Sequence, residues 1–259
     1  MNRLDQWMVA LEARHLADLR FAEVTRALRA LSSTYVERRS GLRGGAALSG
    51  GGKRAAFALF YGPLHYLLTQ AIVTQLPGAN RISGPLVDLG CGTGAAGAAW
   101  ASACERPPAL VGVDRHPWAV REATIAYRDL AVEGRAVVGD IGRDPLPRGR
   151  AYLAAFALNE LPDQARERLL AGLLDRANRG DAVLIVEPLA KTVAPWWGRA
   201  IIPFVEQGGR VDEWRFHAPL PPLVEKLDRA AGLRHREITG RSLWIAGAST
   251  PPRGRAASS

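Results

Sequence analysis

The sequence predicts an α/β fold in which a mostly parallel β-sheet is covered by helices on both faces. Two observations support this prediction. From Pro85 onward, short apolar runs alternate with amphipathic stretches of helical length. The first of these runs passes directly into a glycine-rich turn, over residues 87–94. Such alternation is typical of strand–helix–strand units, whose strands lie parallel and are buried on both faces.

A basic, helical region is expected over residues 1–84, before the sheet begins. Apolar residues between 3 and 31 recur at helical spacing, which indicates a pair of amphipathic helices. The stretch 41–54 is rich in glycine and arginine and predicts a basic loop. An apolar helix over about 55–76 is expected to follow and to end at a proline–glycine pair.

Residues 85–248 are expected to form the α/β domain. The pattern predicts strands near 85–89, 109–113, 135–138, 151–157 and 182–187, and helices near 94–104, 117–131 and 163–178. An insertion over 188–218 interrupts the alternation. A helix near 220–231 and two strands near 233–239 and 242–246 would then complete the sheet, and the tail from 249 to 259 is predicted to be disordered.

Composition indicates a globular protein, since 47% of the residues are hydrophobic. Two cysteines, Cys91 and Cys104, are too few for a disulfide framework or a four-cysteine metal site. A reducing cytoplasm is therefore the expected setting. The sequence predicts neither a signal peptide nor a membrane span, because no run of eighteen apolar residues occurs and acidic residues interrupt the N-terminus.

The net charge of +9 lies outside the central segment. Residues 1–84 carry 11 basic and 5 acidic side chains and residues 188–259 carry 11 and 6, whereas residues 85–187 carry 12 and 14. Positive flanks favour a polyanionic partner, because binding to phosphates releases counterions. Codon bias offers an alternative, since arginine supplies 31 of the 34 basic residues, as a GC-rich genome would produce.

The run from Asp88 to Gly94 reads Asp-Leu-Gly-Cys-Gly-Thr-Gly. Gly92, Gly94 and Gly97 also satisfy the dinucleotide pattern G-x-G-x-x-G, which is weak when taken alone. The full run closely resembles the first motif of the class I S-adenosylmethionine-dependent methyltransferases. That resemblance implies a Rossmann-like sheet with an antiparallel last strand, and S-adenosylmethionine as cofactor. It assigns Gly90, Cys91, Gly92 and Gly94 to the loop against the ligand and Asp88 to the orientation of its amino group.

Two further acids follow later strands, as the same family requires. Asp114 ends the second strand, where a carboxylate can accept both ribose hydroxyls. Asp140 follows the third strand and resembles the acid that receives the adenine amino group, with Ile141 packing on the ring. Each has a structural alternative: Asp114 could cap the helix near Pro117, and Asp140 could be an ordinary turn residue.

The expected catalytic residues are Asn159 and Glu160, which follow the fourth strand and face the transferred methyl group. Asn159 is also expected to contact the cofactor. Enzymes that methylate exocyclic amines often carry an Asn/Asp-Pro-Pro-aromatic motif here, and this chain has Glu160-Leu161 after the asparagine. Neither cysteine is placed for covalent catalysis. The structural alternative is that Asn159 caps the next helix and Glu160 is a solvated residue of its first turn.

A narrower resemblance rests on short motifs, namely residues 52–58, Leu158-Asn159-Glu160-Leu161, Ile185-Val186-Glu187-Pro188, and Gly208-Gly209-Arg210 with Trp214. Together they are similar to the mitochondrial small-ribosomal-subunit assembly methyltransferase-like family and its bacterial relatives. This similarity spans roughly residues 20–246 and implies RNA or the small ribosomal subunit as partner. The cysteine cluster of the mitochondrial members is absent from this chain.

The aromatic residues of the insertion allow two interpretations. Trp196, Trp197, Trp214 and Phe216 could stack on an unpaired base or close over the pocket, or the tryptophans could bury the insertion against the sheet. The histidines show no ligand spacing with cysteines or acids, so no metal is expected.

Three functions remain open from the sequence. The first is an S-adenosylmethionine-dependent methyltransferase that acts on RNA. The second is a methyltransferase for a small molecule or protein, with the insertion as a lid. The third is a non-catalytic ribosome assembly factor that binds the cofactor as a structural ligand. The acceptor atom and the oligomeric state do not follow from the residues.

Overall fold

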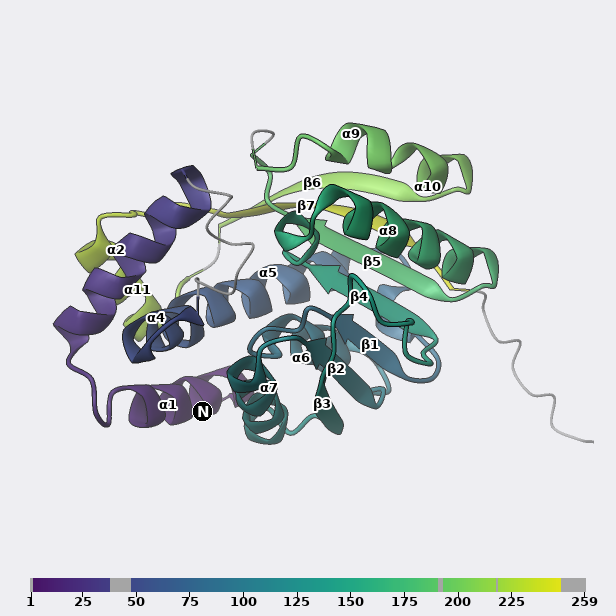
Figure 1. Ribbon diagram of the computed structural model, residues 1–259. Helices are drawn as coiled ribbons and strands as arrows, with labels where there is room; N and C mark the ends of the chain where they lie inside the picture. The colour runs from purple at the N-terminus through teal and green to yellow at the C-terminus, as the bar shows by residue number, and fades with distance from the viewer. Residues whose placement is uncertain (1, 38–47, 191–192, 218, 248–259) are drawn as a thin grey trace, which may run out of the picture.

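The computed structural model describes residues 2–37, 48–190, 193–217 and 219–247. Seven strands form one sheet in the order β3-β2-β1-β4-β5-β7-β6 (Figure 1). The strands are β1 (Leu86–Leu89), β2 (Leu110–Asp114), β3 (Gly134–Val138), β4 (Ala151–Ala155), β5 (Ala182–Glu187), β6 (Arg210–Phe216) and β7 (Ile238–Ile245). The first five are parallel, and β7 pairs antiparallel with both β5 and β6. The expected fold class is confirmed.

Helices cover both faces of this sheet. In chain order they are α1 (Arg3–His15), α2 (Phe21–Glu37), α4 (Gly51–Ala56), α5 (Gly62–Gln75), α6 (Ala95–Ala103), α7 (Pro117–Asp129), α8 (Asp163–Asn178), α9 (Trp197–Ala200), α10 (Ile202–Glu206) and α11 (Pro222–Ala231). A π-helical segment, η2 (Phe57–Tyr61), joins α4 to α5, and short 3₁₀ turns occur at η3 (Ala79–Arg81) and η4 (Leu158–Glu160).

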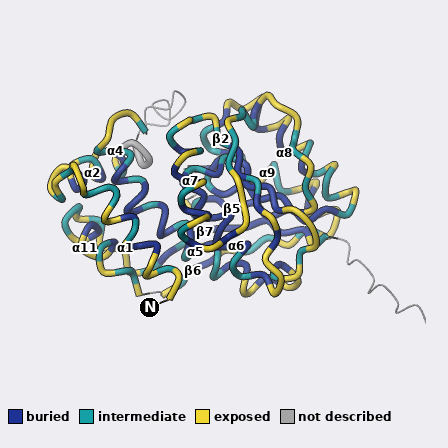
Figure 2. The backbone as a smooth tube through the Cα atoms, turned by 90° about the horizontal axis from the view of Figure 1, so that it is seen from below, coloured by how far each residue is buried: buried dark blue, intermediate teal, exposed yellow. Residues whose placement is uncertain are grey.

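Alternation of side chains along the strands divides the core into two layers. In β1, Leu86 packs in the cluster that contains α5, α6 and the N-terminal helices, while Val87 and Leu89 pack in the cluster that contains α8 and the insertion helices. The buried backbone follows these strands through the centre of the molecule (Figure 2). Helices α1, α2, α4 and α11 lie together beyond one end of the sheet (Figure 1).

Within the described ranges, the continuous helical stretch Gly51–Gln75 is long and apolar enough to cross a membrane by composition, with a mean hydropathy of 1.3. Of its most apolar window, 67% is buried inside the fold. Its apolar side chains therefore build the core under β7 and α6. The helix begins at Gly51, so the end of the expected loop 41–54 is helical, while residues 41–47 of that loop lie outside the described part.

The closing strands differ from the sequence prediction. The expected strand over 233–239 is wrong: β7 begins only at Ile238, and its antiparallel partner β6 comes from the end of the 188–218 insertion. Residues 234–237 do not extend the strand. Arg234 has a φ of +54°, and His235 contacts Asp228, near the end of α11, through both its backbone N–H and its ring Nδ1.

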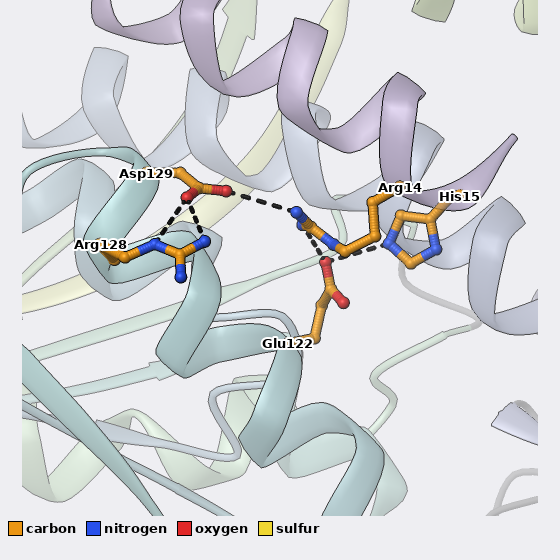
Figure 3. A network of polar contacts seen from close by, with 5 residues as sticks. All are labelled: Arg14, His15, Glu122, Arg128 and Asp129. Carbon is orange, nitrogen blue, oxygen red and sulfur yellow. Dashed lines mark hydrogen bonds and ion pairs between the residues drawn. The ribbon is translucent and has the colours of Figure 1, made fainter. Parts of the chain in front are cut away.

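A buried ion-pair network joins the N-terminal helices to the sheet domain (Figure 3). Arg14 of α1 donates to Glu122 of α7 at 2.6 Å and lies 3.4 Å from Asp129. His15 also contacts Glu122, at 3.0 Å. Glu122 is only 3% exposed. Burial alone would raise its pKa, but the hydrogen bonds and charges of His15 and Arg14 lower it overall. Charge pairing thus fixes α1 against α7.

Candidate active site

A cavity of about 520 Å³ opens at the carboxyl ends of the parallel strands, where β1 lies between β2 and β4. The connection from β1 leads to β2 and that from β4 leads to β5, in opposite directions, and open α/β sheets bind ligands at such a point. The sheet side of the cavity is lined by the glycine loop and by residues that follow β2, β3 and β4. The opposite side is lined by Phe57, Tyr61 and His65 from the N-terminal helices.

The glycine loop turns sharply between β1 and α6. Gly90, Gly92 and Gly94 have φ angles of +72°, +53° and +77°, which side chains disfavour. A Cβ atom on Gly90 would lie 2.6 Å from Cβ of Ala157, so glycine is also required by the close approach of the β4 loop. The Cys91 thiol is buried, and burial raises its pKa well above the usual range, so it presents backbone to the cavity and no thiolate.

Asp88 and Asp114 hold this loop in place. Asp88 is 1% exposed and accepts the N–H of Gly97 at 3.0 Å. Asp114 accepts the N–H of Gly92 at 2.9 Å and that of His116 at 2.8 Å. The cap of α7 is His116, whose Nδ1 accepts from Trp118 N, so Asp114 does not cap that helix itself. Both acids line the cavity.

Asp140 and Ile141 line the next part of the cavity wall. The Asp140 carboxylate accepts the N–H of Gly142 at 2.9 Å and lies 3.7 Å from Arg143. It is therefore a turn residue as well as a cavity residue. The side chain of Ile141 packs toward the glycine loop, 3.3 Å from the position that a Cβ of Gly90 would take.

The donor and acceptor chemistry of this wall fits a cationic nucleoside. Carboxylates at the ends of β1, β2 and β3 face one cavity, and carboxylates accept hydrogen bonds from hydroxyl and amino groups. Burial, together with the nearby charge of Asp114, raises the pKa of Asp88 to about 7, although the hydrogen bond from Gly97 opposes the rise. A positively charged amino group next to Asp88 would restore its ionised form. The wall is therefore preorganised for S-adenosylmethionine, whose amino and ribose groups supply those donors.

Asn159 is held on both sides of its amide. Its Nδ2 donates to Glu187, and its Oδ1 accepts from Nε1 of Trp196 at 2.8 Å. An indole N–H can only donate, so this pairing fixes which end of the amide carries oxygen. The helix α8 has Pro162 as its N-cap, so Asn159 does not cap it. No role for Glu187 follows from the sequence pattern, yet this fully buried carboxylate orients the expected catalytic asparagine.

Glu187 is supported from three directions. It accepts the N–H of Leu158 at 3.1 Å in addition to the amide of Asn159. Arg241 faces it across the β5–β7 pair. Burial raises the pKa of Glu187 to about 8, although its hydrogen bond with Leu158 and the charge of Arg241 oppose that rise.

Glu160 lies in η4, before α8 begins, and is half-buried at the cavity. Burial raises its pKa to about 7, and the negative charge of Asp114 adds to the rise. It is therefore not the solvated first-turn residue of the alternative interpretation. A carboxyl group that titrates near neutral pH can exchange protons with a bound acceptor.

Aromatic rings form the side of the cavity opposite the sheet, and the sequence pattern does not predict this ring wall. Phe57, Tyr61 and His65 recur every four residues through η2 and α5, so they share one face of the helix. The ring of His65 stacks on Phe156 with centroids 4.2 Å apart, and Phe156 has a φ of +58°. A bulky residue in this region is strained, and such strain is concentrated at functional sites.

The ring wall carries no charge at neutral pH, although His65 and Tyr61 have polar ring atoms. Burial lowers the pKa of His65 to about 4 and raises that of Tyr61 to about 12, so both are neutral at pH 7. Phe57 reaches the glycine loop, since a Cβ on Gly92 would lie 3.4 Å from its ring. The ring wall therefore extends from the glycine loop to the end of β4.

The insertion tryptophans divide between the two interpretations. Trp197 and Trp214 are 5% and 8% exposed, so they are core residues and cannot stack on a base. Phe216 stacks on Trp214 at 5.6 Å. Of the three insertion tryptophans, Trp196 is the one that binds Asn159, through its indole N–H. Among the described residues, no group of three or more His, Cys, Asp or Glu side chains could hold a metal ion.

Comparisons with known proteins agree with this geometry. Residues 86–180 match the model of the methyltransferase domain family. The solved mitomycin 7-O-methyltransferase MmcR is 16% identical, with a TM-score of 0.54, over 93% of this chain and 72% of that one. Human N-acetylserotonin methyltransferase, solved with S-adenosylmethionine, is also 16% identical, with a TM-score of 0.51, over 93% and 70%.

The S-adenosylmethionine-dependent methyltransferase SibL shares the fold with a TM-score of 0.50 at 16% identity, over 93% of this chain and 74% of that one. No curated protein sequence matches the chain significantly. The structural matches include the N-terminal helices and establish the fold, while the domain match falls on the strands and loops that build the cavity wall. Residues 86–180 thus match the methyltransferase domain family, and the chain shares its fold with an S-adenosylmethionine-dependent methyltransferase.

Proposed function

We propose that this chain transfers the methyl group of S-adenosylmethionine to a nitrogen or oxygen atom of a small, flat acceptor. The observation that carries the proposal is the ring wall of Phe57, Tyr61, His65 and Phe156, which closes a cavity of about 520 Å³ over the cofactor loop. The cofactor and the reacting group of the acceptor must share this volume, so that group has to be compact. Flat rings pack favourably against aromatic side chains.

When bound, S-adenosylmethionine supplies an electrophilic methyl group on a sulfonium. The chain's own contribution is to position the acceptor and to exclude water. Asn159 lines the cavity, and beyond its bonds to Glu187 and Trp196 its amide has a second N–H and a second oxygen lone pair with which to hold the acceptor. Glu160, with a pKa of about 7, receives the proton that the acceptor atom loses as it becomes methylated.

A second candidate is an RNA base as the flat acceptor, which matches the resemblance to ribosome assembly factors. A specific observation favours it: the pKa of His116 is lowered by burial and then by the positive charges of Arg54, Arg115 and Arg121. His116 and Arg115 also line the cavity. A cluster of positive charge beside the pocket suits a phosphate next to a base that has left its stack.

The test is incubation of purified protein with methyl-labelled S-adenosylmethionine and separate RNA, protein and small-molecule fractions of the source cell. Label in the small-molecule fraction supports the proposal. Label in RNA, with an affinity that falls steeply as salt is raised, selects the second candidate. Label in protein selects a protein acceptor. The control is the Asn159→Ala variant, which is expected to lose label incorporation while it still binds S-adenosylhomocysteine.

Absence of label from every fraction, together with tight binding of S-adenosylhomocysteine, would contradict both acceptor proposals. It would favour the third function, a ribosome assembly factor that holds the cofactor as a structural ligand. Asn159→Ala would then leave biological activity intact, because no methyl transfer would depend on it.

A further inference from the structure

A second cavity, of about 840 Å³, lies between helix α8 and the insertion helices α9 and α10. One wall is formed by α8 and the other by the insertion. Its principal apolar residues are Leu170, Leu174, Trp196, Pro203 and Phe204. This volume is large enough for a ligand group and is not used by the cofactor wall.

The second cavity adjoins the methyl-transfer pocket. Asn159, Leu161 and Val193 line both. Trp196 lines the second cavity, and its indole N–H binds Asn159. A molecule whose reactive group lies beside Asn159 is therefore next to the space against α8.

Two of the four charged residues of the second cavity, Arg166 and Asp163, are paired with each other. Arg166 is 8% exposed, binds Asp163 at 2.7 Å and places its guanidinium 4.9 Å from the centre of the Trp196 ring. It also donates to the carbonyl of Leu161 at 3.3 Å. The basic residues Arg166 and Arg199 are balanced by Asp163 and Glu167, so the cavity has no net charge to attract an ionic ligand.

We propose that the acceptor has two parts: a flat reactive head between the ring wall and Asn159, and an apolar tail that lies in the cavity against α8. The proposal rests on the methyl-transfer function and specifies its substrate class. Burial of a hydrocarbon tail between Leu170, Leu174 and Phe204 supplies binding energy far from the reacting atom. Trp196 lies between the head and the tail of the acceptor. The tail must therefore be long enough to pass the Trp196 ring before it reaches the cavity against α8.

The test uses a homologous series of 4-alkylphenols, from 4-methylphenol to 4-octylphenol, with protein saturated in S-adenosylhomocysteine. Affinity is measured by calorimetry and by the fluorescence of Trp196 against a Trp196→Phe reference. Once the chain passes Trp196, each added methylene is expected to raise affinity by up to about fourfold, which corresponds to about 0.8 kcal/mol for each buried CH₂.

Two variants narrow the cavity from opposite walls. Ala171→Trp adds bulk from the exposed side of α8, and Ala200→Phe adds it from α9. Both are expected to abolish the dependence on chain length while 4-methylphenol still binds. The matched control is Gln164→Trp, an exposed position of α8 that does not line the cavity, and it is expected to keep the dependence.

Equal affinity along the series in the unmodified protein would overturn the proposal, as would the same length dependence in all three variants. Binding of S-adenosylhomocysteine is measured separately for each protein. Its loss would count against the proposed function itself, whereas retained binding without length dependence would count against the two-part acceptor alone.

Discussion

Gly90 and Gly78 have similar backbone angles, with φ of +72° and +77°, but very different surroundings. A Cβ on Gly90 would collide with Ala157, at 2.6 Å, whereas a Cβ on Gly78 would have nothing within 4 Å. The two positions therefore separate the cost of an unfavourable φ from the cost of crowding at the cofactor loop. Of these two positions, Gly90 is the one that combines both costs.

Gly90→Ala is expected to lower the free energy of unfolding by more than Gly78→Ala, which should cost about 1 kcal/mol for the backbone angle alone. The loop must also move away from Ala157, so Gly90→Ala should abolish binding of S-adenosylhomocysteine. Chemical denaturation and calorimetry on both variants measure these effects. Equal destabilisation, with binding intact in both, would contradict the role assigned to the close contact.

Asp114 gives a second prediction at the level of one side chain. Asp114→Asn keeps the shape and one acceptor for the N–H of Gly92 but removes the charge. A lost charge-assisted bond to the ribose is worth about 1.5–3 kcal/mol, so the Kd for S-adenosylhomocysteine should rise about 10- to 150-fold. Asp175→Asn, in an exposed pair with Arg179, should bind normally. An unchanged Kd for Asp114→Asn would remove the residue from the cofactor site.

At the scale of elements, the contact between α1 and α7 decides whether the N-terminal helices stay over the cavity. Its central charge, Glu122, is buried. In the ion pair of Arg81 and Glu105, by contrast, the side chains are 72% and 56% exposed. Buried and exposed ion pairs respond very differently to the loss of one partner, because only the buried partner is left without water.

Glu122→Gln is accordingly expected to destabilise the protein by about 3–5 kcal/mol, since Arg14 is left with an incomplete partner. Glu105→Gln should change stability by less than about 1 kcal/mol. Denaturant titration measures both. Hydrogen exchange should also show faster opening of α1 in Glu122→Gln. Similar stability of the two variants would mean that apolar packing alone holds α1 in place.

The elements themselves were largely predictable from the sequence. Apolar periodicity placed the five parallel strands and helices α6, α7 and α8 within a few residues, because buried parallel strands and amphipathic helices have distinct periods. The three acids could be assigned to one cavity for a related reason. Parallel strands bring their carboxyl ends to the same edge, so Asp88, Asp114 and Asp140 had to meet there.

Features that depend on distant contacts were not predictable. The sequence pattern places edge strand β6 in the 188–218 insertion and predicts no strand there, because the pairing of β6 with β7 crosses the intervening α11. The π segment that aligns Phe57 and Tyr61 leaves no periodic signal. Glu187 was visible only as the end of a strand, and its bond to Asn159 spans 28 residues.

At the scale of the whole molecule, several carboxyl groups in and beside the cavity have a raised pKa. Burial raises the pKa of Asp88 and Glu160 to about 7 and that of Glu187 to about 8. The same groups titrate near 4 in an unfolded chain. Folded protein therefore binds more protons than unfolded protein between those values, and its stability depends on pH through this difference.

The sign of that dependence follows directly. Groups with a raised pKa contribute stability below about pH 4 that is lost as pH rises through 7 to 8, so the Tm of ligand-free protein should fall from pH 5 to pH 8. Asp88→Asn, which can still accept from Gly97, should flatten this slope. S-adenosylhomocysteine should raise Tm more at pH 8 than at pH 5, because its ammonium group favours ionised Asp88. Thermal unfolding at constant ionic strength measures all three. A Tm that rises over this range, with the same slope in Asp88→Asn, would show that the buried acids are ionised before any cation arrives.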